Sequence, residues 1–319
     1  MRELLARLME NSLAGAWLIA AVLVIRCIFR NAPKRLFPLL WCTVILRLMM
    51  PYTPQSGLSL MPVSGGTAES IADTPLKALP YGTIVWVAGV ACMLLYGVIS
   101  YGRIKRKLAT AVKLTADVYQ SDCIQTPFVL GFFSPRIYVP FGLEQAQTQS
   151  VLAHERAHIK LRHHRIKPIA FVILSIYWFH PLVWVLYVCL GRDMELNCDE
   201  LAVRNMNAYE RSAYCDTLLA FSSGAPDALS CRAAFGGGVV KKRIRNVLSC
   251  KKSKRWVTAA AVTAFAVIAL CFATSPKQQN PSADFSAVQN EKDRIEAENA
   301  AIRQLIALQE QTMHQSREE

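Results

Sequence analysis

Four long apolar blocks constrain the fold of this sequence more than any other feature. They cover residues 12–29, 36–50, 81–101 and 256–274, and the second is shorter and contains Arg47. A helix of about 20 apolar residues crosses a hydrocarbon core about 30 Å thick. Of 319 residues, 53% are hydrophobic and 18% are charged, a composition typical of membrane proteins. We therefore predict a mainly α-helical integral membrane protein with about four transmembrane helices.

The first block has an alternative interpretation as a cleaved signal peptide, because Arg2 and Arg7 precede it. Against this, Arg26 and Arg30 stand at the end of the apolar run, and no small-residue cleavage site is evident. We therefore favour an uncleaved transmembrane helix.

The net charge of +13 could indicate a nucleic-acid partner, but no basic stretch is interleaved with aromatic residues that stack on bases. Basic residues instead lie beside the apolar blocks. We therefore expect the partner of these residues to be a membrane lipid bilayer, and we expect no direct nucleic-acid binding. By the positive-inside rule, the connections at 30–35 and 103–107 are cytoplasmic, while the N-terminus and the polar loop 51–79 lie outside. All ten cysteines fall in predicted spans or cytoplasmic segments, as a reducing compartment favours.

A metal-ligating pattern stands near the middle of the chain, at His154, Glu155 and His158. Residues four apart share one face of an α-helix, so both imidazoles can bind one ion, and Glu155 can act as the catalytic base. A catalytic zinc takes three protein ligands and keeps a fourth position open, and we predict Glu195 as the third. Asp199 shares a helix face with Glu195 and can orient a histidine from behind. We expect one Zn²⁺ per chain.

The apolar stretch 166–190 is long enough to cross the membrane once, but His180 and Pro181 interrupt it. A single crossing would place Glu195 on the opposite side of the membrane from the two histidines. We therefore predict two short apolar helices, about 168–179 and 182–190, that form a hairpin on the cytoplasmic side.

Short β-prone runs flanked by turn residues occupy residues 127–140. Ile137–Val139 is predicted to be an edge strand, because prolines at 135 and 140 flank it and proline is tolerated at an edge. An edge strand near the metal helix could bind an extended peptide by strand addition, or it could belong to a structural hairpin. The sequence leaves both open.

Three further features concern the second half of the chain. Cys198 is a rival metal ligand near Glu195, which we interpret as a small buried residue. Residues 275–319 are predicted to form an outside tail, helical or disordered, with too few heptads for a coiled coil. A candidate self-cleavage or regulatory segment contains the basic residues Lys241, Lys242, Arg243, Lys251 and Lys252.

Taken together, these motifs resemble the peptidase family of bacterial antirepressor membrane proteins of the BlaR/MecR type. The resemblance runs from the first apolar block to about Arg255. It is carried by Gly131–Pro140, His154–His158, Tyr177–Pro181, Arg192–Glu195, Cys198–Glu200, Ala234–Gly238 and Lys242–Leu248.

The resemblance implies a cytoplasmic, gluzincin-like zinc protease domain over residues 102–255, with a small β element. His154, His158 and Glu195 would be its ligands, Glu155 its general base and Asp199 a residue behind the ligands. Signalling members of the family cleave themselves or a cytoplasmic repressor when an outside domain detects its ligand.

The sequence departs from the family pattern at two places. Position 163 is a histidine where members often carry aspartate, which puts a supporting role for that position in doubt. The expected tail is also too short for a penicillin-binding sensor domain. Although Ser249 and Lys252 match an acylating Ser-x-x-Lys pattern, they lie in a basic run without such a domain. We therefore do not expect β-lactam sensing.

We expect a multi-pass zinc metalloendopeptidase of a bacterial cell membrane that cleaves itself, a cytoplasmic repressor, or both, on an external stimulus. One alternative is a constitutive membrane quality-control zinc protease. The other is a non-catalytic receptor stabilised by the metal, against which Glu155 argues, because a structural site needs no base. The stimulus, the scissile bond, the oxyanion-stabilising residue and a homodimer are left open.

Overall fold

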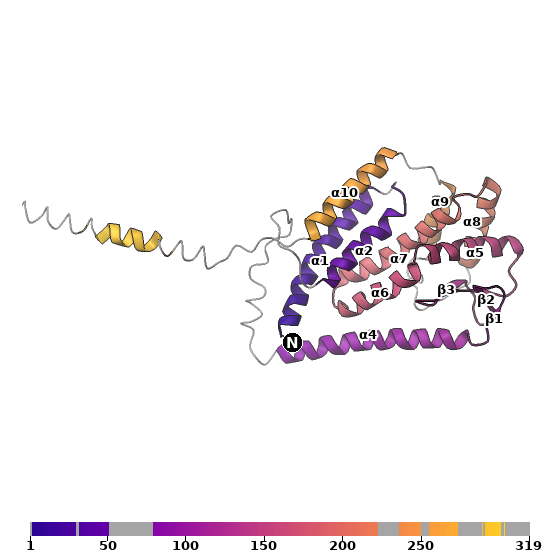
Figure 1. Ribbon diagram of the computed structural model, residues 1–319, viewed down its shortest axis with the longest axis horizontal. Coiled ribbons are helices and arrows are strands. Elements are labelled where there is room, and N and C mark those ends of the chain that lie inside the picture. Colours follow the sequence, from indigo (N-terminus) through magenta and orange to yellow (C-terminus); the bar gives the residue numbers. More distant parts are fainter. Residues whose placement is uncertain are drawn as a thin grey trace, which may run out of the picture.

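The computed structural model describes residues 2–29, 32–50, 79–222, 236–249, 255–273, 289, 291–300 and 303. Residues 51–78 of the predicted outside loop and most of the predicted tail lie outside these ranges. The described chain is mostly helical with one small sheet (Figure 1). Its elements are α1 (Arg2–Ile28), α2 (Leu36–Met49), α4 (Leu79–Lys107), β1 (Val112–Lys113), β2 (Val118–Ser121), β3 (Phe128–Leu130), β4 (Arg136–Pro140), α5 (Gln145–Lys160), α6 (His163–Ile176), α7 (Pro181–Ala202), α8 (Ala208–Ser222), α9 (Gly236–Leu248) and α10 (Arg255–Ala273).

Apolar helices form one end of the molecule. Helices α1, α2 and α10 lie together there, and α6 and α7 pack against α1 and α2 (Figure 1). Large side chains such as Trp41, Tyr177 and Leu186 are almost fully buried in the core between them. Close packing of these side chains holds the helices together, as is typical of helices within a membrane.

Two helices of the described chain are long and apolar enough to cross a membrane, over Asn11–Ile28 of α1 and Tyr81–Lys107 of α4. The apolar parts of α2 and α10, Leu36–Met49 and Thr258–Val267, are shorter. Helix α4 runs along one side of the molecule, contacts α6 and α1, and leaves its apolar surface exposed (Figure 1). Of the about four transmembrane helices expected, α1 and α4 are thus long enough to cross a membrane. Membrane spans at α2 and α10 stay predictions.

Helices α6 and α7 form a hairpin that breaks at His180 and Pro181. Helix α6 ends at Ile176, and Pro181 is the first residue of α7, where proline is tolerated because its missing N–H needs no partner. Helix α7 then continues for 22 residues, so the apolar segment 182–190 and the segment with Glu195 form one helix rather than two. The end of α7 that carries Glu195 packs against α5.

The sheet has the strand order β1-β2-β4-β3, and this order corrects the expectation for Ile137–Val139. Strand β4 pairs in parallel with β2 on one side and antiparallel with β3 on the other, so it is an internal strand. The flanking prolines do not prevent this, because Pro135 precedes the strand and Pro140 is its last residue. Strand β3 is an edge strand of this sheet, and it contacts α5.

Helices α5 and α9 pack against α7, and α8 packs against both α5 and α9. Helix α5 begins with a capping box between Glu144 and Gln147 and packs on α7 and α8. Helix α9 contacts both α7 and α8, around a small core that contains Val203, Tyr214 and Val247. Side chains from α5, α6, α7, α8 and α9 therefore meet at one place.

Candidate metal centre

The three predicted ligands converge between α5 and α7. His154 Nε2 and His158 Nε2 lie 3.1 Å apart on successive turns of α5. Glu195 Oε2 of α7 is 3.3 Å from His154 Nε2, and its Oε1 is 3.6 Å from His158 Nε2. All three donor atoms lie within 4.8 Å of one another. Glu155, next to His154, is buried as well, with 6% of its surface exposed.

Asp199 and Tyr214 hold His154 from behind. The Nδ1 atom of His154 is 2.8 Å from the Tyr214 hydroxyl and 3.2 Å from Asp199 Oδ1. The Tyr214 hydroxyl in turn donates a hydrogen bond of 2.8 Å to Asp199 Oδ1. A hydrogen on Nδ1 satisfies these acceptors and leaves Nε2 to face Glu195, which is the tautomer that a metal ligand needs. The predicted position of Asp199 behind a histidine agrees with this geometry.

His158 is held from behind by another histidine. His163 Nδ1, at the start of α6, lies 3.1 Å from His158 Nδ1, and Cys198 Sγ of α7 lies 3.3 Å from His163 Nδ1. Burial and the nearby Lys167 lower the pKa of His163 to about 4, so its ring is neutral and can accept a hydrogen bond from His158. The histidine that departs from the family pattern therefore takes a supporting position.

Arg243 of α9, a member of the candidate self-cleavage or regulatory segment, is buried in the centre. Its Nε donates to Asp199 Oδ2 at 2.8 Å and its Nη2 to Asp199 Oδ1 at 2.7 Å. Its Nη1 also lies 3.4 Å from Glu195 Oε2. Because a fork of two parallel bonds to a buried carboxylate is strong and directional, Arg243 ties α9 to the ligand-bearing helix.

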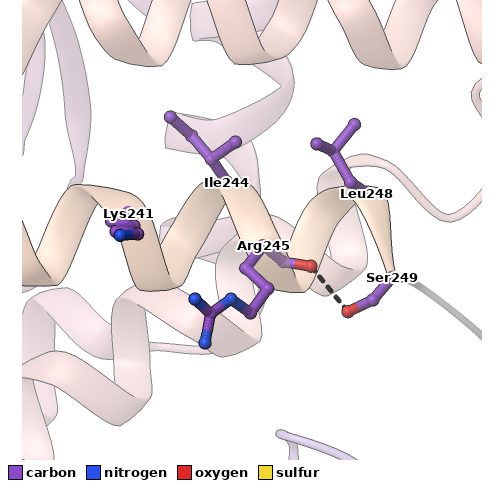
Figure 2. A pocket seen from close by; sticks show the side chains of 5 residues that line it. All are labelled: Lys241, Ile244, Arg245, Leu248 and Ser249. Carbon is purple, nitrogen blue, oxygen red and sulfur yellow. Dashed lines mark hydrogen bonds between the residues drawn. The ribbon is translucent and has the colours of Figure 1, made fainter.

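The other basic residues of α9 face away from the centre. Lys241, Lys242 and Arg245 are exposed. A pocket along the helix is lined by Lys241, Ile244, Arg245, Leu248 and Ser249 (Figure 2), and Ile244 also packs against the small core at Tyr214. The Ser249 hydroxyl donates to the Arg245 carbonyl at 2.6 Å, which extends the end of the helix. Lys251 and Lys252 lie outside the described residues.

Charges in the centre are strongly coupled. Burial lowers the pKa of His154, but hydrogen bonds to Asp199 and Glu195 outweigh it and raise the pKa to about 9. Burial would raise the pKa of the Asp199 carboxyl, whereas Arg243 and His154 hold it well below its usual range. Burial also raises the pKa of Glu155. The centre thus stabilises a positive charge between His154 and Glu195.

This arrangement fits a divalent metal ion. Two imidazole nitrogens and a carboxylate oxygen are donors that suit zinc, which accepts nitrogen and oxygen at about 2.0–2.2 Å in a tetrahedral arrangement. Such bond lengths separate neighbouring donors by about 3.3–3.6 Å, and the separations in this site are 3.1, 3.3 and 3.6 Å. Both histidines already have partners at Nδ1, so their Nε2 atoms are directed to the shared centre.

Tyr214, Arg243, His163 and Lys167 belong to this centre although spacing along the sequence did not assign them there. Lys167 Nζ lies 3.5 Å from Glu195 Oε1 and is half-exposed. Tyr214 is 60 residues from His154, and no periodicity relates the two. A buried position for Arg243 had one local signal, because it falls on the same face of its helix as Val239 and Val247.

The fold and the site together define a class: a helical, membrane-associated protein of the metallopeptidase type. A helix with His-Glu-x-x-His faces a helix with Glu-x-x-x-Asp, beside two helices of membrane-spanning length. The chain belongs to the BlaR1 peptidase M56 family, which matches residues 6–247.

Two regulatory proteins are among the relatives of this chain. The Regulatory protein BlaR1 of Bacillus licheniformis is 26% identical over 211 residues, which cover 58% of this chain and 35% of that protein. The Methicillin resistance mecR1 protein of Staphylococcus aureus is 24% identical over 103 residues, or 31% of this chain and 18% of that protein. The chain thus matches about a third or less of the length of these relatives.

Proposed function

We propose that this chain is a membrane-embedded zinc metalloendopeptidase of the signalling, antirepressor type. It would cleave itself, a cytoplasmic repressor, or both, in response to a stimulus outside the cell. The observation that carries this proposal is the convergence of His154, His158 and Glu195 beside the buried carboxylate of Glu155. Kinship to two regulatory proteins supports a signalling role.

Each residue has a distinct part in peptide hydrolysis. His154, His158 and Glu195 hold the zinc ion, which when bound supplies a Lewis acid for a peptide carbonyl and for water. Glu155 accepts a proton from the attacking water and passes it to the leaving amine. Its raised pKa strengthens it as a base, because burial disfavours the charged carboxylate. Asp199 and Tyr214 keep His154 in the ligating tautomer.

The unpaired edge of strand β3 is consistent with a peptide substrate. Strand β3 contacts α5, and among the described strands its outer edge has no partner. An extended peptide could therefore add to Phe128–Leu130 through main-chain hydrogen bonds, one of the two roles that the sequence left open for Ile137–Val139. Cleavage within α9, in contrast, would require the helix to unwind around buried Arg243.

The decisive experiment replaces Glu155 by Gln in the full-length chain and compares cellular peptides, including fragments of the chain itself, with those of the wild type. We expect membrane insertion and metal content to persist while product formation falls at least about 100-fold, the usual contribution of a general base. Asp216→Asn, at an exposed carboxylate of α8, is the matched control and should behave as wild type. Unchanged products in Glu155→Gln would refute the peptidase assignment.

Metal removal provides a second test of the same site. A chelator should abolish cleavage by the wild-type chain, and added Zn²⁺ should restore it. Cleavage that persists in metal-free protein would contradict the proposal.

Two alternative functions make different predictions. A constitutive quality-control protease would degrade misfolded membrane proteins without a stimulus, and its gene would have no small winged-helix repressor gene beside it. A non-catalytic receptor would signal normally with Glu155→Gln. Gene context tests the first alternative, and a signalling assay of Glu155→Gln tests the second.

A further inference from the structure

A second group of metal-ligating side chains lies beside the first and shares one member with it. His158 of α5, His163 of α6 and Cys198 of α7 are buried, with exposed fractions of 8%, 2% and 0%. His158 Nδ1 is 3.1 Å from His163 Nδ1, which is 3.3 Å from Cys198 Sγ. One donor atom from each of the three lies within 4.8 Å of the others. Three helices thus direct two imidazoles and a thiol to one point.

The separations resemble those in a metal site. Zinc binds histidine nitrogen at about 2.0–2.1 Å and cysteine sulfur at about 2.3 Å, so neighbouring tetrahedral donors lie about 3.3–3.6 Å apart. The two separations here, 3.1 and 3.3 Å, are as close to these values as those among His154, His158 and Glu195. Two histidines and a cysteine also form a soft donor set that prefers thiophilic ions to magnesium or calcium.

We propose that His158, His163 and Cys198 form an alternative site for a thiophilic divalent metal ion, Zn²⁺ or Cd²⁺, adjacent to the site at Glu195. On binding, the thiol of Cys198 releases its proton to solvent and the thiolate forms the sulfur–metal bond. The neutral rings of His158 and His163 each contribute one lone pair. The proposal does not depend on peptidase activity, because it concerns metal binding alone.

The shared histidine makes the two sites mutually exclusive. A neutral imidazole has one nitrogen lone pair, and His158 presents Nε2 to Glu195 but Nδ1 to His163. One ion per chain can therefore occupy either site, and its transfer requires the proton of His158 to move between the two ring nitrogens. An ion held by Cys198 is therefore not held by Glu195.

The test replaces the native ion by Co²⁺ or Cd²⁺ in the full-length, detergent-solubilised protein and records the ultraviolet absorption. A bond between Co²⁺ or Cd²⁺ and a thiolate gives a charge-transfer band that nitrogen and oxygen ligands do not give. We expect the band in the wild type at one equivalent of metal, and a stronger band in Glu195→Gln, which weakens the first site alone. Cys198→Ser should lose the band and keep one equivalent of metal.

Cys215→Ser is the matched control. Cys215 is also a buried cysteine, next to Tyr214 on α8, but it does not belong to the group of His158, His163 and Cys198. It should keep the band, whereas His163→Asn should weaken the band as Cys198→Ser does. Absence of the band in both the wild type and Glu195→Gln would overturn the proposal. If the proposed zinc site at Glu195 fails instead, Cys198→Ser will bind no metal while the wild type retains the band, so the two failures are distinguishable.

Discussion

Tyr214 links His154 to Asp199 through a single hydroxyl group. Tyr214→Phe removes that hydroxyl with almost no change of shape, so the ring of His154 loses one of its two partners at Nδ1. Partners behind a metal ligand typically contribute 10- to 100-fold to metal affinity, and we expect zinc affinity to fall by about 10-fold. Competition with a chelator of known affinity measures the change.

The matched control for Tyr214→Phe is Tyr209→Phe, at an exposed tyrosine of the same helix. It should leave zinc affinity at the wild-type value. Equal affinities in the two variants would show that the Tyr214 hydroxyl does not support His154.

Arg243 compensates the buried charge of Asp199. Arg243→Leu leaves this carboxylate without its bidentate partner, and loss of one partner of a buried ion pair typically costs about 3–5 kcal/mol. We therefore expect a much lower unfolding midpoint in thermal denaturation of the metal-free protein.

Arg245→Leu, on the exposed side of α9, serves as the control for Arg243→Leu because it changes the same residue type two positions away. It should change the free energy of unfolding by about 0.5 kcal/mol or less. If both substitutions lower the free energy of unfolding by similar amounts, the ion pair between Arg243 and Asp199 does not stabilise the protein.

Among the helices, α7 is hydrogen-bonded to both α1 and α2 through Asp193, two residues before Glu195. The Asp193 carboxylate accepts hydrogen bonds of 2.8 Å from both Nε and Nη2 of Arg26 on α1, and one of 2.9 Å from Trp41 Nε1 on α2. Arg26→Gln should destabilise the protein by about 3 kcal/mol, because Asp193 is left buried and uncompensated. The double variant with Asp193→Asn should recover part of the loss.

Thermal unfolding in detergent measures the stability of Arg26→Gln and of the double variant relative to the wild type. Arg35→Gln, at an exposed residue just before α2, is the control. If the double variant is less stable than Arg26→Gln alone, Arg26 does not compensate the buried negative charge of Asp193.

Helix α4 approaches the α6–α7 hairpin closely at two glycines, eight residues apart on one face. A Cβ atom at Gly89 would lie 2.3 Å from the ring of Trp178, and one at Gly97 would lie 2.6 Å from Phe171. Small residues at such contacts allow apolar helices to approach one another. Gly89→Leu should therefore weaken the packing of α4, at a cost of about 1–3 kcal/mol in thermal unfolding.

Gly82 provides the control on the same helix, since nothing lies within 4 Å of a Cβ atom at that position. Gly82→Leu should be close to neutral. A loss as large as that of Gly89→Leu would show that α4 responds to helix propensity or hydrophobicity rather than to contact with Trp178.

At the scale of the whole molecule, the hairpin of α6 and α7 returns the chain to the end where α5 lies. Our predicted orientation therefore places the sheet and α8 in the cytoplasm and loop 51–79 outside. In a chain without native cysteines, a membrane-impermeant maleimide should label a cysteine at position 64 in intact cells. Cysteines at the exposed positions Phe133 and Tyr209 should react only after permeabilisation.

Two results of this labelling would contradict the predicted orientation. One is reaction at position 64 only after permeabilisation. The other is reaction of positions 133 and 209 from opposite sides, which would separate α5 from the end of α7.

Local periodicity explains what could be predicted. His154 and His158 share a face because both belong to one helix, and the break at Pro181 follows from the missing N–H of that residue alone. The placement of Ile137–Val139 at an edge was wrong, because strand order depends on which segments find each other as hydrogen-bond partners. Flanking prolines carry no information about that choice.

Local patterns were enough to predict the apolar helices, the grouping of Glu155 with His154 and His158, and the pairing of Glu195 with Asp199. The folded chain was needed to bring Tyr214, Arg243 and the His163–Cys198 pair next to these residues. The contacts join positions separated by 60, 44 and 35 residues, respectively. Helix periodicity acts over one or two turns, whereas contacts over such distances arise only when α5, α6, α7, α8 and α9 pack together in the folded chain.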